Sequence, residues 1–507
     1  MTPGPSRREF VRSASLIGAA IGIEEICLGL PPVSAVEARW DPGVVQFDLG
    51  IEPLVRLLEQ TPRERVLEVF AQRIKQGTAY RDVLTALHLA GIRNIPPRPD
   101  VGWKFHAVLV LHSAHLASLA AMEHERWLPI FFALDFFKSQ QMYDERESGW
   151  SMTVVDEARV PEAGRARKAF MRAMDGWDSE AADAAAASLV RSASAQEVFE
   201  LFALYGMRDF RNIGHKPIYV ANGWRTLEYV GEQHAEPMVR SLVYALLNHH
   251  DQPNPSTSEL EADAPWRSNQ QLVERIEPDW ARGKLSSSAT VELLSTLRSA
   301  SWSEACDHVV ELLNGGVSPQ SIQDGIFAGA AELLMRQPGI VALHGMTATN
   351  ALAHAFRRST NDRTRRLLLL QNAAFMVQFR EELKGMGSWG DGQFDTLEPA
   401  QQGGDRDEAL AGVFDLIGGD GKAAMASTLG YLQTHGAGDF IQAARRSNMM
   451  RCTNGHDYKF VSAVTEDYQH VSPQWRDRYL AAGVNYLRGS RMGKNRLIEP
   501  TLALLAT

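Results

Sequence analysis

Cysteine is scarce in this chain, with three residues among 507. Three cysteines are too few for a disulfide framework, and none is part of a CxxC pair, so a cysteine-ligated zinc site is not indicated. Cys306 and Cys452 lie in the second half of the chain. The sequence leaves open whether these two pair, because it does not show how close they come.

Long apolar runs, positive charge and common catalytic motifs are also missing. No run approaches the roughly 18 apolar residues of a membrane span. The net charge of −9 argues against nucleic acid or an anionic membrane surface as the main partner. His124-Glu125 is followed by Leu128 instead of the second histidine of an HExxH zinc motif, and neither a P-loop nor a G-x-S-x-G elbow is present.

What remains is the composition of a soluble globular protein, with 45% hydrophobic and 22% charged residues. A length of 507 residues favours two or more domains. Apolar residues recur at spacings of three and four, as in Glu52–Gly77, whereas the alternation typical of strands is scarce. The sequence therefore predicts an all-α protein.

The N-terminus resembles a twin-arginine export signal. Ser6–Arg12 reads SRREFVR, the apolar run Ala14–Ile23 follows, and Val33-Ser34-Ala35 fits a cleavage site. This pattern predicts a signal peptide over residues 1–35, the twin-arginine translocase as a partner, and a periplasmic or secreted protein without a membrane span in the mature chain. The alternative is an ordinary basic N-terminal arm.

An internal repeat is indicated by matching positions in the two halves. His106 and His344 lie 238 residues apart within a window that aligns without a gap. The Gly-His pairs that end at His215 and His456 lie 241 residues apart. This shared offset predicts a duplicated helical unit whose two copies pack with pseudo-two-fold symmetry.

The predicted boundaries follow from the repeat and from one linker. Residues 251–265, DQPNPSTSELEADAP, combine three prolines with serines and acids and show no periodicity. We therefore expect a first helical repeat over residues 36–250 and a second over residues 266–507.

The repeat places four histidines, His106, His215, His344 and His456, at equivalent positions. If the copies pack about one axis, the four can converge there, and imidazole binds iron, copper or haem. Two other readings stay open. Each histidine can be a core residue bonded to a carbonyl, or the four can form a metal-free acid–base or substrate site.

The segment GHKPIYVANGWRTLEY (residues 214–229) resembles the signature of the questin oxidase-like family, and VALHGMTATNAL (residues 341–352) resembles a second segment of that family. The matching residues are His215, Ile218 and Gly223 in the first segment and Thr347 after His344 in the second. Tyr219 stands where the family has another histidine. The resemblance implies an all-helical oxidoreductase that inserts oxygen into aromatic, polyketide-like ketones.

Together these patterns predict an exported oxidoreductase that acts on an aromatic or apolar small molecule at a histidine-lined site between the two repeats. His112, Asn350 and Tyr219 are expected to assist the four histidines, and Trp103 and Trp224 to wall an apolar pocket. The alternative is a non-catalytic helical binding or scaffold protein of the periplasm. Convergence of the four histidines on one cavity would favour the enzyme.

Overall fold

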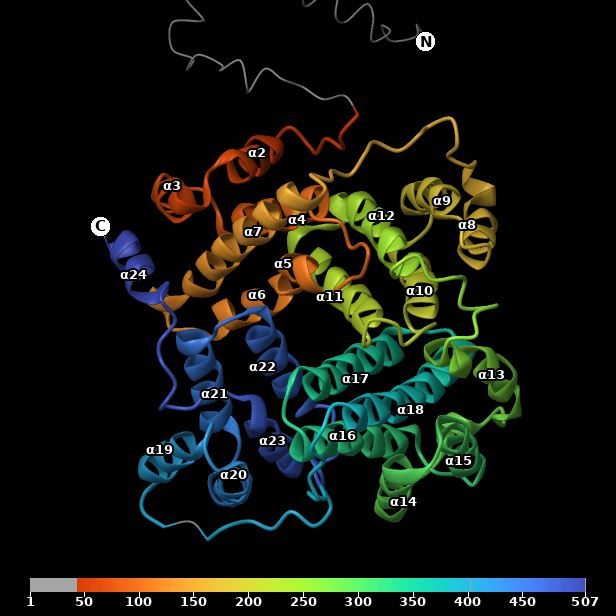
Figure 1. Ribbon diagram of the computed structural model, residues 1–507, viewed down its shortest axis with the longest axis vertical. Helices are drawn as coiled ribbons and strands as arrows, with labels where there is room; N and C mark the ends of the chain where they lie inside the picture. Colours follow the sequence, from red (N-terminus) through yellow and green to blue (C-terminus); the bar gives the residue numbers. More distant parts are fainter. Residues whose placement is uncertain (1–42, 402, 507) are drawn as a thin grey trace, which may run out of the picture. The chain divides into compact units, whose positions relative to one another are not determined.

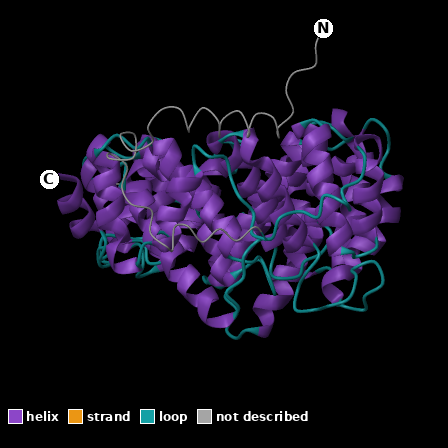
Figure 2. Ribbon diagram, turned by 90° about the horizontal axis from the view of Figure 1, so that it is seen from above, coloured by secondary structure: helices purple, strands orange, loops and turns teal. Residues whose placement is uncertain are grey.

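The computed structural model of the protein describes residues 43–401 and 403–506, and from Val45 onward they form one compact unit. These residues form 23 α-helices, α2 to α24, joined by loops, and no strand occurs among them (Figures 1 and 2). The extended pairing within this range is one isolated bridge between Lys284 and Val317. The all-α prediction is confirmed, whereas the predicted signal peptide and its boundary lie outside the described residues.

The helices cover most of the chain. Those of the first half are α2 (Glu52–Gln60), α3 (Arg63–Lys75), α4 (Tyr80–Asn94), α5 (His106–Leu109), α6 (Leu111–Ala120), α7 (Leu128–Glu147), α8 (Ala166–Asp175), α9 (Ser179–Ser192), α10 (Ala195–Gly206), α11 (His215–Val230) and α12 (Ala235–Leu246). Those of the second half are α13 (Ala264–Leu272), α14 (Ser287–Ser299), α15 (Trp302–Asn314), α16 (Pro319–Arg336), α17 (Ile340–Arg358), α18 (Asp362–Gly385), α19 (Arg406–Leu416), α20 (Gly421–His435), α21 (Gly438–Arg451), α22 (Gly455–Asp467), α23 (Arg476–Gly483) and α24 (Ile498–Ala506). Within the described ranges, no helix has both the length and the apolarity to cross a membrane.

Four helical elements close a ring at the centre of this unit. Helix α11 packs on α17, α17 on α22, α22 on α5 and α6, and these two pack on α11 (Figure 1). Every residue from 215 to 227 in α11 and from 341 to 353 in α17 is buried. A helix that is buried on all sides belongs to the core of a larger assembly of helices, which the outer helices provide here.

Three further features were considered from the sequence: the segment around His106, the pairing of Cys306 with Cys452, and the duplication. The segment at residues 103–120, which holds His106, His112 and His115, starts with a 3₁₀ turn, Trp103–Phe105, and is interrupted at Val110 between α5 and α6. Cys306 and Cys452 are both buried and free, so they do not pair. The duplication with pseudo-two-fold symmetry and the boundaries at residues 36–250 and 266–507 stay predictions.

Candidate metal centre

Each of the four repeat-matched histidines lies near the start of a helix. His106 begins α5 and His215 begins α11, while His456 is the second residue of α22 and His344 lies one turn into α17. The four elements are those of the central ring, so the histidines point into one region although they are up to 350 residues apart.

A glycine allows the close approach at two of these helix starts. Gly214, before His215, has φ +76°, and a Cβ there would come within 2.7 Å of the Ala348 side chain on α17. Gly455, before His456, would bring a Cβ to 3.1 Å from the Phe136 ring. Any side chain at Gly214 would therefore strain the backbone and push α11 away from α17.

The four Nε2 atoms meet. His106 Nε2 lies 2.7 Å from His456 Nε2 and 3.3 Å from His215 Nε2. His215 Nε2 lies 3.0 Å from His344 Nε2. Ligand atoms of all four residues lie within 4.8 Å of one another, which is the arrangement of a group that can hold a metal ion.

The other ring nitrogens fix the protonation of three of these histidines. Nδ1 of His106 lies 3.0 Å from the Trp103 carbonyl, Nδ1 of His215 lies 2.7 Å from the Asn212 carbonyl, and Nδ1 of His344 lies 2.6 Å from the Ile340 carbonyl. A carbonyl only accepts, so each Nδ1 must donate, and a neutral imidazole then carries a lone pair on Nε2.

These tautomers leave a gap in the hydrogen bonding. His215 Nε2 faces His106 Nε2 and His344 Nε2 with a lone pair on each atom and no proton to share. A proton on Nε2 of His456 can satisfy only the contact between His456 and His106. A cation at the centre would convert these facing lone pairs into coordinate bonds, and carbonyl-bonded Nδ1 atoms are the usual support of histidine ligands.

Burial keeps the four imidazoles neutral. It lowers the pKa of His215 to about 3 and that of His456 to about 2, with the nearby Lys459 as the next cause. Burial also lowers the pKa of His106 and His344 well below 6.5, and the neighbouring charges add to the effect. A metal ion needs the neutral form, so the site is ready to bind at neutral pH without releasing protons.

Lys459 is a functional candidate that the sequence reasoning missed. It lies one turn after His456 on α22, is 2% exposed, and its Nζ has no hydrogen-bond partner among the described residues. Burial lowers the pKa of Lys459 to about 7. A buried amine without a partner is costly to keep. Its positive charge also lowers the pKa of all four histidines, so Lys459 lies close to the site. A signal was available, because Lys459 shares a helix face with His456.

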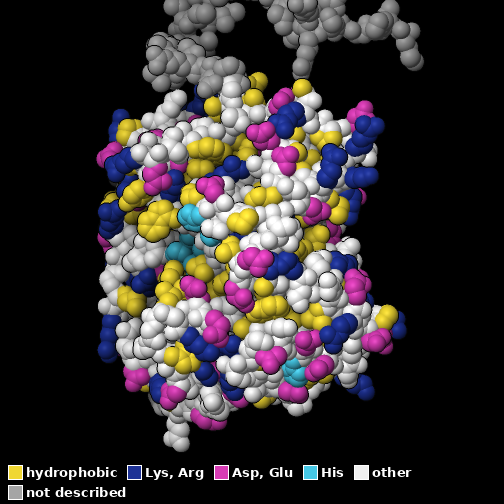
Figure 3. Space-filling model, turned by 45° about the vertical axis from the view of Figure 1, so that its right-hand side comes forward, with side chains coloured by type: hydrophobic (Ala, Val, Ile, Leu, Met, Phe, Trp, Pro, Cys, Tyr) yellow, Lys and Arg dark blue, Asp and Glu magenta, His cyan; other side chains and the backbone are white. Residues whose placement is uncertain are grey.

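The histidine cluster opens into a cavity of about 520 Å³. Trp103, Phe136, Tyr143, Ile213 and Ile340 give it apolar walls, and Asp100, Gln140, Asn212 and Asn454 add polar groups. Three of the apolar residues are among the exposed large side chains, with Trp103 exposed to 72%. On the face seen in Figure 3, histidine side chains are visible in a hollow bordered by hydrophobic side chains.

The two predicted wall residues, Trp103 and Trp224, line different pockets. Trp103 lines the cavity beside His106. Trp224 is nine residues beyond His215 on α11 and lines a different pocket. Phe136, one of the phenylalanines at residues 131–137 in α7, also lines the cavity.

The three predicted assisting residues lie outside the cavity lining. His112 is buried and stacks on Tyr229, with 5.9 Å between ring centroids. Asn350 donates to Asp467 at 2.8 Å and accepts from Arg225 at 3.0 Å. Tyr219 is fully buried, and its hydroxyl has no partner among the described residues. The three side chains therefore belong to the buried packing around the ring of helices, outside the cavity lining.

Comparisons with known proteins give no relative: no protein-family model, curated protein or solved structure matches this chain.

Proposed function

We propose that this protein is a metal-dependent oxidoreductase in which His106, His215, His344 and His456 hold one iron or copper ion. The observation that carries the proposal is the set of facing Nε2 lone pairs, which Nδ1 bonds to carbonyls enforce in three of the four residues. Neutral imidazole is a ligand that suits both metals.

The spacing favours a bare ion over a haem or a closed zinc site. With metal–nitrogen bonds of about 2.1 Å, adjacent ligands of an octahedral ion lie about 3.0 Å apart and those of a tetrahedral ion about 3.4 Å apart. The three Nε2 separations are 2.7, 3.0 and 3.3 Å, and their mean of 3.0 Å equals the octahedral value. They also leave no space for a porphyrin between the nitrogens. A six-coordinate ion with four histidines keeps two positions for other ligands, as redox catalysis needs.

The cavity supports an apolar or aromatic substrate. Apolar side chains line it beside the histidines, and a few polar groups can orient a carbonyl or hydroxyl. We propose oxidation of an aromatic substrate, with oxygen insertion next to a ketone as the reaction that the questin oxidase-like resemblance implies. One atom of O₂ enters the product, and the other leaves as water with two electrons and two protons from an external reductant.

The place of action is a further part of the proposal. The SRREFVR segment supports export through the twin-arginine translocase to the periplasm or the medium. That route carries folded proteins, so the metal would be inserted before export.

The test combines metal analysis with turnover. The protein is purified from its native source, its metal content is determined by mass spectrometry, and oxygen uptake is followed with an aromatic ketone and a chemical reductant. About one equivalent of iron or copper and substrate-dependent oxygen uptake, both lost in His344→Gln, are expected. A metal-free protein whose His344→Gln variant only loses stability would instead support the alternative, a non-catalytic helical scaffold.

A further inference from the structure

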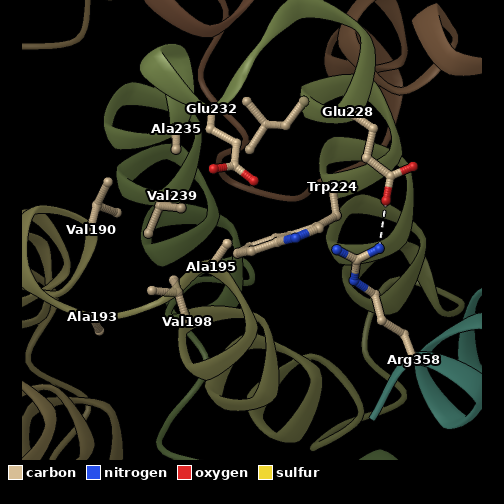
Figure 4. Close-up of a pocket in the computed structure, with 11 residues that line it drawn as sticks. Val190, Ala193, Ala195, Val198, Trp224, Glu228, Glu232, Ala235, Val239 and Arg358 are labelled. Carbon is tan, nitrogen blue, oxygen red and sulfur yellow. Dashed lines mark hydrogen bonds and ion pairs between the residues drawn. The ribbon is translucent and has the colours of Figure 1, made fainter.

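A second pocket lies toward the other end of α11, away from the histidines. Its volume is about 140 Å³, and it shares no lining residue with the histidine cavity. Trp224 follows His215 by nine residues, so the two lie about 14 Å apart along the helix axis. The lining residues come from five helices and two connections and are Val190, Ala193, Ala195, Val198, Trp224, Leu227, Glu228, Glu232, Ala235, Val239 and Arg358 (Figure 4).

Trp224 brings an aromatic ring to the wall of this pocket. The residue is 5% exposed, and its ring packs edge-on against Phe199, with 5.3 Å between centroids. An indole ring in a pocket wall can attract a cation that lies near its face.

The charges of the lining leave one carboxylate free. Glu228 forms an ion pair with Arg358, and these two charges cancel. The Glu232 carboxylate forms no hydrogen bond or ion pair with another described residue. Figure 4 shows the Glu232 carboxylate directed toward the space beside the Trp224 ring. The pocket thus combines apolar walls, an aromatic ring and one uncompensated negative charge.

We infer that this pocket is a binding site for a small organic cation, an amine with an apolar body, held by Glu232 and Trp224. The ammonium group would pair with the Glu232 carboxylate and lie near the indole, where the ring attracts a cation. The apolar body would contact Val198, Leu227 and Val239. The site does not depend on the metal, since none of its residues contacts the histidine cluster.

The test is calorimetric titration of the full chain with phenethylammonium and, separately, with 3-phenylpropionate, which has a similar body and the opposite charge. Phenethylammonium is expected to bind about tenfold more tightly or better, because one carboxylate near the surface gives a modest, screened attraction. Glu232→Gln should abolish this preference, and Trp224→Phe, which keeps an aromatic ring, should weaken binding several-fold. Glu145→Gln, which removes an exposed carboxylate on α7, is the matched control and should bind as the parent does.

Two outcomes would overturn the inference. One is equal affinity for the two probes, and the other is an unchanged preference in Glu232→Gln. Amine coordination to the metal is a separate source of heat, so the titration is repeated on His344→Gln. Binding that disappears in His344→Gln would assign the amine to the metal centre and refute the second site, whereas unchanged binding there supports it even if no metal is found.

Discussion

Proton competition at the four histidines predicts how metal affinity depends on pH. Four histidines with an ordinary pKa near 6.5 would each lower metal affinity about eightfold between pH 7.0 and 5.5, or about 4,000-fold together. Here burial lowers the pKa of His215 to about 3 and that of His456 to about 2, and lowers the other two well below 6.5. The folded protein therefore keeps these imidazoles neutral throughout this range.

Lys459 is the nearby group that gains a proton in this window, because its pKa is lowered to about 7. If an ammonium and a metal ion exclude each other, its protonation reduces affinity by about sixteenfold at most over the same interval. We therefore expect a loss between zero and about sixteenfold in the parent protein. Lys459→Met keeps the length of the side chain without the amine, and this variant should show a flat profile.

The assay is competition for Zn²⁺ against a chelating dye calibrated at each pH, with circular dichroism to show that the protein stays folded. Zinc is chosen because it needs no redox control. A loss of about a thousandfold or more in a folded protein would refute the reasoning, since it would mean that several of the histidines titrate normally.

Three more predictions follow from particular residues. His344→Gln should lower bound metal from about one equivalent to below about 0.1, measured by mass spectrometry, while His354→Gln, outside the cluster, should keep it. His88 is buried with neither ring nitrogen bonded, and burial lowers its pKa to about 3. Its stability contribution is therefore lost as pH falls below 6.5, and His88→Leu should remove about 1.4 kcal/mol per pH unit of acid destabilisation in urea unfolding; an unchanged slope would contradict this. Trp103→Ala should change the unfolding free energy by less than about 0.5 kcal/mol, because the residue is exposed, yet weaken binding of an aromatic probe to the cavity; normal probe binding would remove Trp103 from the site.

The sequence predicted the fold class and the four histidines of the candidate centre because both leave regular spacings along the chain. Helical spacing predicted the all-α class, and the offset between His106 and His344 and between His215 and His456 predicted that these four belong together. A glycine before two of the histidines also carried structural meaning, since Gly214 permits the contact with Ala348.

The rest depended on tertiary packing that a linear pattern does not contain. Asn350 lies six residues after His344, as His112 lies six after His106, yet both residues lie in the buried layer outside the cavity. Trp224 lies too far along α11 to reach the histidines. Gln140 on α7 and Asn212 before α11 line the cavity because the chain brings distant segments together, and no sequence spacing marks them.

The measurement that tests the central claim most directly is X-ray absorption spectroscopy at the edge of the metal found in the purified protein. One ion with four imidazole nitrogens at about 2.1 Å is the predicted result, with one fewer imidazole in His456→Gln. A protein that binds no metal, or a metal whose shell holds two or fewer imidazoles and does not change in His456→Gln, would contradict the account.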